Sequence, residues 1–251
     1  MTRGLWGGVI LLAIIGVGAA AARGVFRADL ASRLDPVRLQ LLEVLDRKDP
    51  FVTQRASELE RFDGRFAAHP TATLLHVLPG GVFLVLALLQ FSPRIRSRHL
   101  QFHRYLGRFL ILAGFLAAAT GLFFGILMPY GGFGETAVIV LVSAVFLAAL
   151  VRAYVAIRGK RVALHREWMI RAVAVAIGVS TVRVVGAAFD VVLSPIGVRP
   201  ADVFVLSLST GWGITLVAAE LWIRYTRRRR ATPVLTAAPR GPSLAEQGGT
   251  G

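Results

Sequence analysis

Two basic segments that contain histidines interrupt an otherwise apolar chain. His99 and His103 lie four residues apart in the first segment, and His165 lies in the second. Imidazole nitrogens bind metals and haem iron, whereas guanidinium groups bind carboxylates and phosphates. Side chains at i and i+4 share one face of a helix, and His165 occupies the equivalent position just before the fifth apolar run. The three histidines are therefore expected to meet at one end of the molecule. The surrounding basic residues are Arg94, Arg96, Arg98, Arg104 and Arg108 in the first segment, and Arg158, Lys160, Arg161, Arg166 and Arg171 in the second.

Three interpretations of these histidines remain open. By default they are interfacial anchors that contact lipid headgroups. A zinc site is the second, but Glu167 is the only nearby carboxylate, and the arginines raise the cost of adding a dication. The third and most specific is one b-type haem, with His103 and His165 as iron ligands and Gly107 leaving room for the porphyrin. The residues assigned to this cofactor site are His103, His165, Arg104, Arg108, Arg166 and Arg171, because guanidinium groups bind carboxylates such as haem propionates.

A second group of polar residues falls inside apolar runs. His76, Arg183 and Asp190 are expected at membrane depth, where an ionisable side chain must face the protein interior, a partner or water. Arg183 and Asp190 are seven residues apart, about 10 Å along a helix. They form either a structural ion pair bridged by His76 or an outward-facing site for a proton, an anion or a quinone. Pro79, beside His76, frees the carbonyl of Leu75 from its helical hydrogen bond.

The elements that position these residues are transmembrane helices. Of the 251 residues, 55% are hydrophobic, and six apolar runs are long enough to cross a bilayer. A crossing needs roughly 20 helical residues for a hydrocarbon layer of about 30 Å. The sequence therefore predicts an all-α polytopic bundle of about six helices, with spans at 5–22, 71–91, 106–129, 136–157, 169–196 and 203–223.

Charge and cysteine content narrow the function. The chain has 29 Lys+Arg against 14 Asp+Glu, and the basic residues cluster beside the apolar runs, which indicates anionic lipid headgroups rather than nucleic acid. Their asymmetry predicts that the basic side of the membrane is cytoplasmic and that both termini lie on that side. The absence of cysteine excludes disulfides, cysteine-bound iron–sulfur clusters, covalent c-type haem and thiol catalysis.

The remaining segments are predicted from composition. Residues 1–22 form the first transmembrane helix or, alternatively, a signal peptide. Residues 23–70 form an extracytoplasmic segment of amphipathic helices that begin after Asp35 and Asp49. Residues 71–223 form a five-helix membrane core, and residues 224–251 form a basic, disordered tail. One face of the third apolar run is smooth enough for a neighbouring helix or a flat cofactor, because it carries Gly107, Gly114, Gly121 and Gly125.

The polar positions carry a family resemblance. The first half comprises His76, Gly80, Gln90-Phe91, the three arginines at 94, 96 and 98, and His103-Arg104-Tyr105-Leu106-Gly107-Arg108. The second half comprises His165-Arg166-Glu167-Trp168-Met169-Ile170-Arg171 and Arg183. Over residues 68–185 the chain resembles the bacterial membrane proteins catalogued as domain of unknown function 2306. The resemblance implies a polytopic helical protein of the cytoplasmic membrane and implies no reaction.

The layout also resembles the four-helix core of two-haem cytochromes of the b561 kind. Such cores pair four histidines across the membrane, but the run 136–157 has none, so His76 lacks an axial partner and at most one haem remains. No phosphate-binding glycine loop, catalytic carboxylate pair or nucleophile elbow is present. We therefore expect single-haem electron transfer between a quinone and a cytoplasmic donor, a proton- or anion-coupled transporter module, or non-catalytic binding of lipid or a partner membrane protein.

Overall fold

Every regular element in the described part of the chain is a helix. The structure is a computed structural model that describes residues 3–25, 61–193 and 195–231. Residues 61–68 are helical and lead directly into α4. The other helices are α1 (Arg3–Val25), α4 (Pro70–Gln90), α5 (Pro93–Arg98), α6 (Leu100–Leu127), α7 (Gly132–Arg158), α8 (Val162–Leu193) and α9 (Pro200–Ala231).

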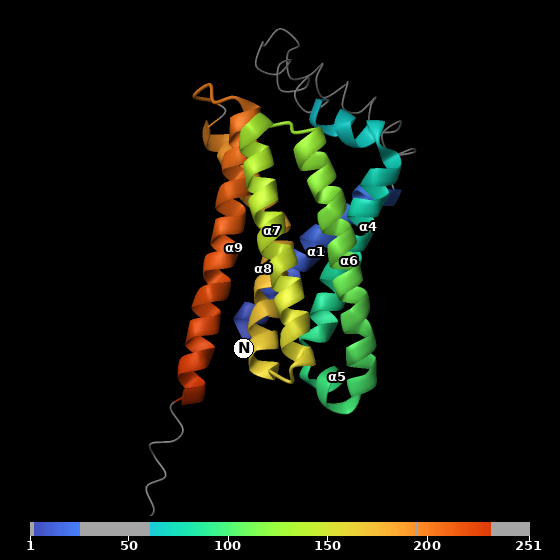
Figure 1. Ribbon diagram of the computed structural model, residues 1–251. Coiled ribbons are helices and arrows are strands. Elements are labelled where there is room, and N and C mark those ends of the chain that lie inside the picture. Colours follow the sequence, from blue (N-terminus) through green and yellow to red (C-terminus); the bar gives the residue numbers. More distant parts are fainter. Residues whose placement is uncertain (1–2, 26–60, 194, 232–251) are drawn as a thin grey trace, which may run out of the picture.

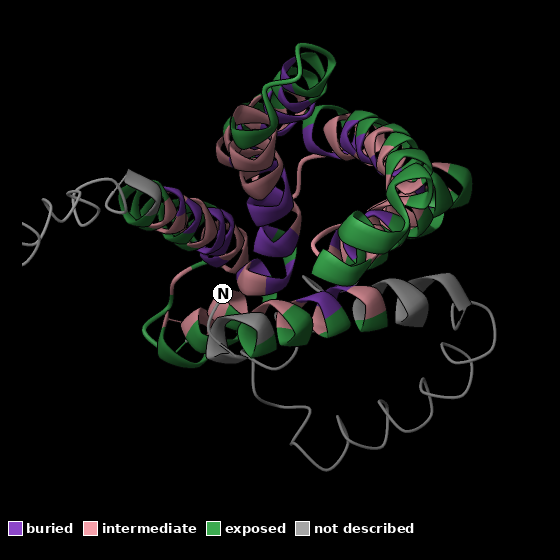
Figure 2. Cartoon of the chain, turned by 90° about the horizontal axis from the view of Figure 1, so that it is seen from below, coloured by how far each residue is buried: buried purple, intermediate pink, exposed green. Residues whose placement is uncertain are grey.

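Five of these helices, α4 and α6 to α9, are long and apolar enough to cross a membrane, and α1 has a shorter apolar stretch. The six predicted spans are therefore confirmed as helices. The five long helices run in one general direction, whereas α1 crosses the bundle obliquely (Figures 1 and 2). It packs on α4 and α8, where a Cβ on Gly16 would lie 2.7 Å from the side chains of Leu84 and Ser180. The predicted helices after Asp35 and Asp49 lie outside the described residues.

Three helices extend beyond the predicted spans by six or more residues at one end. α6 begins at Leu100 and α8 at Val162, six or seven residues before the apolar runs that mark them, and α9 continues to Ala231. Apolar runs mark only the part of a helix that lies in hydrocarbon, and arginines are good helix formers outside it. As a result, the later part of each histidine-containing basic segment forms the first turns of α6 or α8, and the last basic run forms the final turns of α9.

The two ends of the bundle differ in charge. The basic end contains α5, the α7–α8 turn at residues 159–161 and the end of α9 (Figure 1). The far end contains the α6–α7 connection at residues 128–131 and the α8–α9 connection. In the far-end connections the one basic side chain, Arg199, pairs with Asp202 at 2.7 Å.

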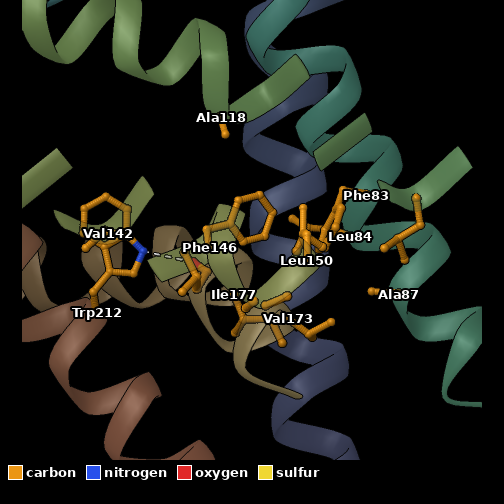
Figure 3. Close-up of a cluster of buried hydrophobic side chains, with 14 of the residues drawn as sticks. Phe83, Leu84, Ala87, Ala118, Val142, Phe146, Leu150, Val173, Ile177 and Trp212 are labelled. Atoms are coloured by element: carbon orange, nitrogen blue, oxygen red, sulfur yellow. Dashed lines mark hydrogen bonds between the residues drawn. The ribbon is translucent and has the colours of Figure 1, made fainter. Parts of the chain in front are cut away.

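Aromatic and small residues fill the centre of the bundle. The Phe83 and Phe146 rings meet edge to face, 5.3 Å apart, beside Leu150 (Figure 3). Trp212 Nε1 donates to the Val175 carbonyl at 2.9 Å and so links α9 to α8. A Cβ on Gly114 would lie within 3.2 Å of Phe83, Phe146 and Leu150, which shows that this part of the glycine face packs against helices.

Large apolar side chains cover the outward faces of the long helices. Leu112, Leu141 and Val155, for example, are exposed on α6 and α7. Exposed apolar surface of this extent is normal where lipid tails are the solvent and exceptional in water. The distribution of apolar side chains therefore agrees with insertion in a membrane and contact with lipid.

Candidate functional site

A cavity of about 600 Å³ lies within the far half of the bundle. Residues from α1, the helical segment 61–68, α4 and α6 to α9 line it, and most of them are apolar or aromatic. Besides the Tyr130 and Trp212 rings, its polar side chains come from helices far apart in the sequence: Arg65, His76, Glu135, Ser143, Arg183, Asp190 and Ser207. The three residues that the sequence predicted as one cluster, His76, Arg183 and Asp190, are thus brought to the same cavity.

The position of His76 is set by α6. Its Nδ1–H donates to the Ala117 carbonyl at 2.9 Å, and Thr120 Oγ1 lies 3.3 Å from the same nitrogen. A carbonyl can only accept, so Nδ1 carries the proton and Nε2 is the acceptor in the neutral ring. Gly121 allows the approach of the ring, because a Cβ there would lie 3.1 Å from His76 Cε1.

The proline beside His76 has the predicted effect on the backbone. Pro79 cannot donate to the Leu75 carbonyl, and Thr120 Oγ1 lies 3.3 Å from that oxygen. The hydroxyl also lies 2.8 Å from the carbonyl of Leu116, one turn earlier in its own helix. Thr120 therefore connects α4 to α6 at the level of His76, where the proline weakens the helical ladder.

Arg183 and Asp190 face the cavity from α8. Arg183 Nη1 donates to the Val179 carbonyl at 3.1 Å, and the residue is exposed although it lies far from both ends of the helix. Asp190 lies about 10 Å nearer the far end, at 1.5 Å of rise per residue. An exposed cation at this depth would be costly in hydrocarbon. The polar side chains of the cavity give Arg183 a less costly environment.

The structure also reveals a buried ion pair that the sequence did not predict. Arg65 Nη1 lies 2.7 Å from Glu135 Oε1, and their side chains are only 9% and 3% exposed. Arg65 Nη1 also lies 3.2 Å from the Met128 carbonyl, while Glu135 Oε2 accepts from the Gly131 N–H at 2.7 Å. Four rings surround the guanidinium carbon at 4.5 to 6.0 Å, those of Phe62, Phe66, Tyr130 and Phe204.

One sequence signal could have suggested this pair. Glu135 is the only acidic residue between the third and fourth apolar runs, in the first turn of α7, where a carboxylate also interacts well with the helix N-terminus. Arg65 gave no comparable signal, because it lies among charged residues that resemble those of a surface helix.

The basic end holds the predicted histidine site. His103 and His165 each occupy the fourth residue of their helix, α6 and α8, and both helices begin at this end. His165 Nδ1–H donates to the Ala153 carbonyl at 2.9 Å, which leaves Nε2 as the unprotonated nitrogen of the neutral ring. His103 lies close enough to His165 and Arg96 for their charges to interact. Its buried Nδ1 has no hydrogen-bond partner among the described residues.

The other predicted members of this site have different surroundings. His99 is the N-cap of α6: its carbonyl accepts from the His103 N–H at 2.9 Å, but its own backbone is not helical and the residue is exposed. Gln90 Nε2 donates to the His103 carbonyl at 2.9 Å and lies 3.7 Å from where a Cβ on Gly107 would be, in the space expected for a porphyrin. Arg104 and Arg108 are exposed, and Arg166 is half-buried.

Arg171 connects α8 to α9. It binds Glu220 through two hydrogen bonds, Nε to Oε1 at 2.5 Å and Nη2 to Oε2 at 3.1 Å. Its guanidinium carbon lies 4.5 Å from the centre of the Trp168 ring, and that of Arg152 lies 4.9 Å from the same ring. A smaller pocket of about 300 Å³ adjoins Trp168, and neither His103 nor His165 lines it.

Within residues 3–25, 61–193 and 195–231, no group of three His, Cys, Asp or Glu side chains could hold a bare metal ion.

These features define a polytopic helical membrane protein with a cavity in one half of its bundle and a basic surface at the other end. Residues 73–223, more than half of the chain, match a family described as "Predicted membrane protein (DUF2306)", and the chain belongs to this family. The matched range includes His76 and the histidines of the two basic segments. It also extends beyond Arg183, the last residue that carried the resemblance. No curated protein and no solved structure matches the chain.

Proposed function

We propose that the protein binds a small amphipathic molecule inside the membrane, in the cavity lined by His76, Arg183 and Asp190. The observation that carries this proposal is the composition of the cavity, whose apolar walls hold a few convergent polar groups. Its volume of about 600 Å³ lies within the usual range for ligand sites, roughly 300–1,000 Å³. An ion pair with a purely structural role does not require such a space.

A variant that narrows the cavity tests this proposal. Gly80 lines the cavity, and a Cβ there would have no neighbour within 4 Å, so Gly80→Leu is expected to reduce the volume of the cavity without a clash. Gly213→Leu is the matched control, since Gly213 has the same free space but lies outside the cavity. Native mass spectrometry of protein purified in nanodiscs should find a small-molecule adduct on the wild type and on Gly213→Leu, and a weaker adduct on Gly80→Leu. A wild type without an adduct, even after incubation with a membrane lipid and quinone extract, would contradict the proposal.

Arg183→Gln separates ligand binding from a structural role. If Arg183 contacts the ligand, the variant should keep its helical circular dichroism and its unfolding temperature and lose the adduct. A variant that does not fold would instead support the structural ion pair with Asp190. The same variant bears on the transporter hypothesis, because a proton- or anion-coupled carrier also needs this cation at its binding site.

A second candidate function concerns the basic end. We propose one b-type haem there, with His103 and His165 as iron ligands, because the hydrogen bond of His165 to Ala153 is of the kind that orients ligating histidines. The buried Nδ1 of His103 without a partner among the described residues also supports it. When bound, such a haem would supply one-electron redox chemistry. The surrounding residues suit the two iron ligands better than they suit the porphyrin ring, because Gln90 lies in the space beside Gly107 that the ring would need.

Absorption spectroscopy tests the haem proposal. Protein expressed with haem supplementation should show a Soret band that shifts on reduction, and His103→Ala and His165→Ala should each lose it. His99→Ala is the control and should keep it, since His99 lies before the helix. A wild type without the band contradicts the proposal. The proposed haem site and the cavity are separate. His103 lies at the haem site and Gly121 lines the cavity, and these two residues of α6 are about 27 Å apart along the helix.

We infer that the basic end faces the cytoplasm of the cell and contacts anionic lipid headgroups there, as the distribution of arginines suggests. The chain has no cysteine, so single cysteines can report the orientation. Ser97→Cys at the basic end and Ile196→Cys in the α8–α9 connection at the far end both change exposed residues. In intact cells a membrane-impermeant maleimide should label only Ile196→Cys, and labelling of Ser97→Cys alone would reverse the orientation.

A further inference from the structure

Arg152 is an exposed cation within the apolar part of α7. It lies six residues before Arg158, the last residue of the helix, and so about 9 Å from the helix end. Its neighbours Val151 and Val155 are 48% and 52% exposed, which shows that the surface around Arg152 faces outward. An arginine that faces hydrocarbon is costly unless it reaches an anion or water at the headgroup level.

No described carboxylate pairs with Arg152. Among the described residues, the acids of the basic end are Glu167 and Glu220, and both pair with other arginines across the α8–α9 interface. Arg152 instead stacks on Trp168, with its guanidinium carbon 4.9 Å from the centre of the ring. Stacking orients a guanidinium and leaves the N–H donors at its edge available for an anion.

The α7–α8 turn holds a second arginine in a fixed position. Lys160 has a left-handed backbone, with a φ of 57°. Its N–H donates to the Ile157 carbonyl at 3.1 Å, and the Arg161 N–H donates to the Ala156 carbonyl at 2.8 Å. These are the two hydrogen bonds of a Schellman motif, which ends a helix in a defined geometry. The backbone of Arg161 is therefore fixed against the end of α7.

Arg152 and Arg161 line one pocket of about 300 Å³, which is called the α7–α8 groove below. The other residues that line it are apolar or aromatic: Val155, Ala156, Leu164 and Trp168. Those of α7 lie at i, i+3 and i+4 and those of α8 at i and i+4, so one face of each helix forms a wall. The N-terminus of α8, which begins at Val162, adds partial positive charge. Two cations above apolar walls match a phosphate that carries hydrocarbon.

We propose that the α7–α8 groove binds one anionic phospholipid, whose phosphodiester accepts hydrogen bonds from Arg152 and Arg161. This inference rests on the proposed contact of the basic end with anionic lipid and gives that contact a defined site. The acyl chains would follow the exposed apolar surface of α7 toward the centre of the bilayer. A zwitterionic lipid is disfavoured, because its ammonium group would lie close to two guanidinium groups.

Native mass spectrometry of the full chain in detergent tests the proposal, because it resolves each bound lipid. The probes are phosphatidylglycerol and phosphatidylethanolamine with the same acyl chains, and inorganic phosphate is the competitor. Arg152→Gln and Arg161→Gln each remove one cation of the groove. Arg158→Gln is the matched control, since Arg158 is also exposed, lies at the same end of α7 and does not line the groove.

We expect the wild type to bind its first phosphatidylglycerol about tenfold more tightly than its first phosphatidylethanolamine, and an equimolar amount of inorganic phosphate not to displace the lipid. Arg152→Gln and Arg161→Gln should each lose about tenfold in affinity for phosphatidylglycerol, as the loss of one hydrogen bond to a charged group would give. Their preference over phosphatidylethanolamine should fall accordingly. Arg158→Gln should match the wild type with both lipids.

The possible failures are distinguishable. Equal wild-type affinity for the two lipids would overturn the proposal and the proposed contact with anionic lipid together. If the wild type prefers phosphatidylglycerol but both groove variants lose no more affinity than Arg158→Gln, the site is wrong and the general contact stands. Displacement of the lipid by equimolar inorganic phosphate would overturn the assignment to a lipid. The wild-type comparisons and Arg161→Gln decide the matter even if circular dichroism shows that Arg152→Gln does not fold.

Discussion

The ion pair between Arg65 and Glu135 is expected to show strong thermodynamic coupling. Glu135→Gln leaves a buried guanidinium without a counter-charge, and Arg65→Met leaves a buried carboxylate. With side chains 9% and 3% exposed, each single change should lower the free energy of unfolding by about 3–5 kcal/mol, the range for breaking a buried pair from one side.

The double variant Arg65→Met/Glu135→Gln should be less destabilised than either single variant. It contains no uncompensated charge, and the methionine keeps apolar contact with the aromatic rings around position 65. If the double change costs less than about 3 kcal/mol, the coupling energy of the cycle is at least about 3 kcal/mol in favour of the pair.

The assay is reversible unfolding in mixed detergent micelles, followed by circular dichroism for the wild type, both single variants and the double variant. The exposed pair Arg199–Asp202 provides the control cycle, because its N···O distance is also 2.7 Å but its side chains are 78% and 47% exposed. Solvent should screen that pair to no measurable coupling. Additive effects at Arg65 and Glu135, equal to those of the control cycle, would refute the argument from burial.

Two further predictions concern the α8–α9 interface. Gly211→Ala should destabilise the protein by about 1–3 kcal/mol, because its Cβ would lie 2.7 Å from the Val182 backbone, whereas Gly213→Ala, with nothing within 4 Å, should be neutral or slightly stabilising. Thermal unfolding in detergent compares the two, and equal unfolding temperatures would mean that the helices are not in close contact there. Glu220→Gln should cost about 1 kcal/mol, a small effect because Glu220 is 42% exposed and its bond to Arg171 is partly screened. The same assay applies, and a loss as large as that expected for Glu135→Gln would contradict this view of the interface.

The depth of His76, Arg183 and Asp190 could be predicted because a membrane restricts the chain strongly. A spanning segment must be a helix with a fixed rise per residue, so positions counted from the helix ends give depths. The same restriction made the six apolar runs reliable as helices. The helix starts at Leu100 and Val162 were missed because hydropathy marks the hydrocarbon boundary and not the helix boundary.

Sequence alone thus determined that the chain is an all-helical membrane protein, which end is basic, and which polar residues fall inside the apolar helices, since these follow from local composition and helical geometry. Only the tertiary structure decided that Arg65 is buried against Glu135, 70 residues away, and that both line the cavity with His76 and Arg183. The physical reason is that burial of a charged side chain depends on a counter-charge and on aromatic walls from several helices, and helix packing alone brings these together.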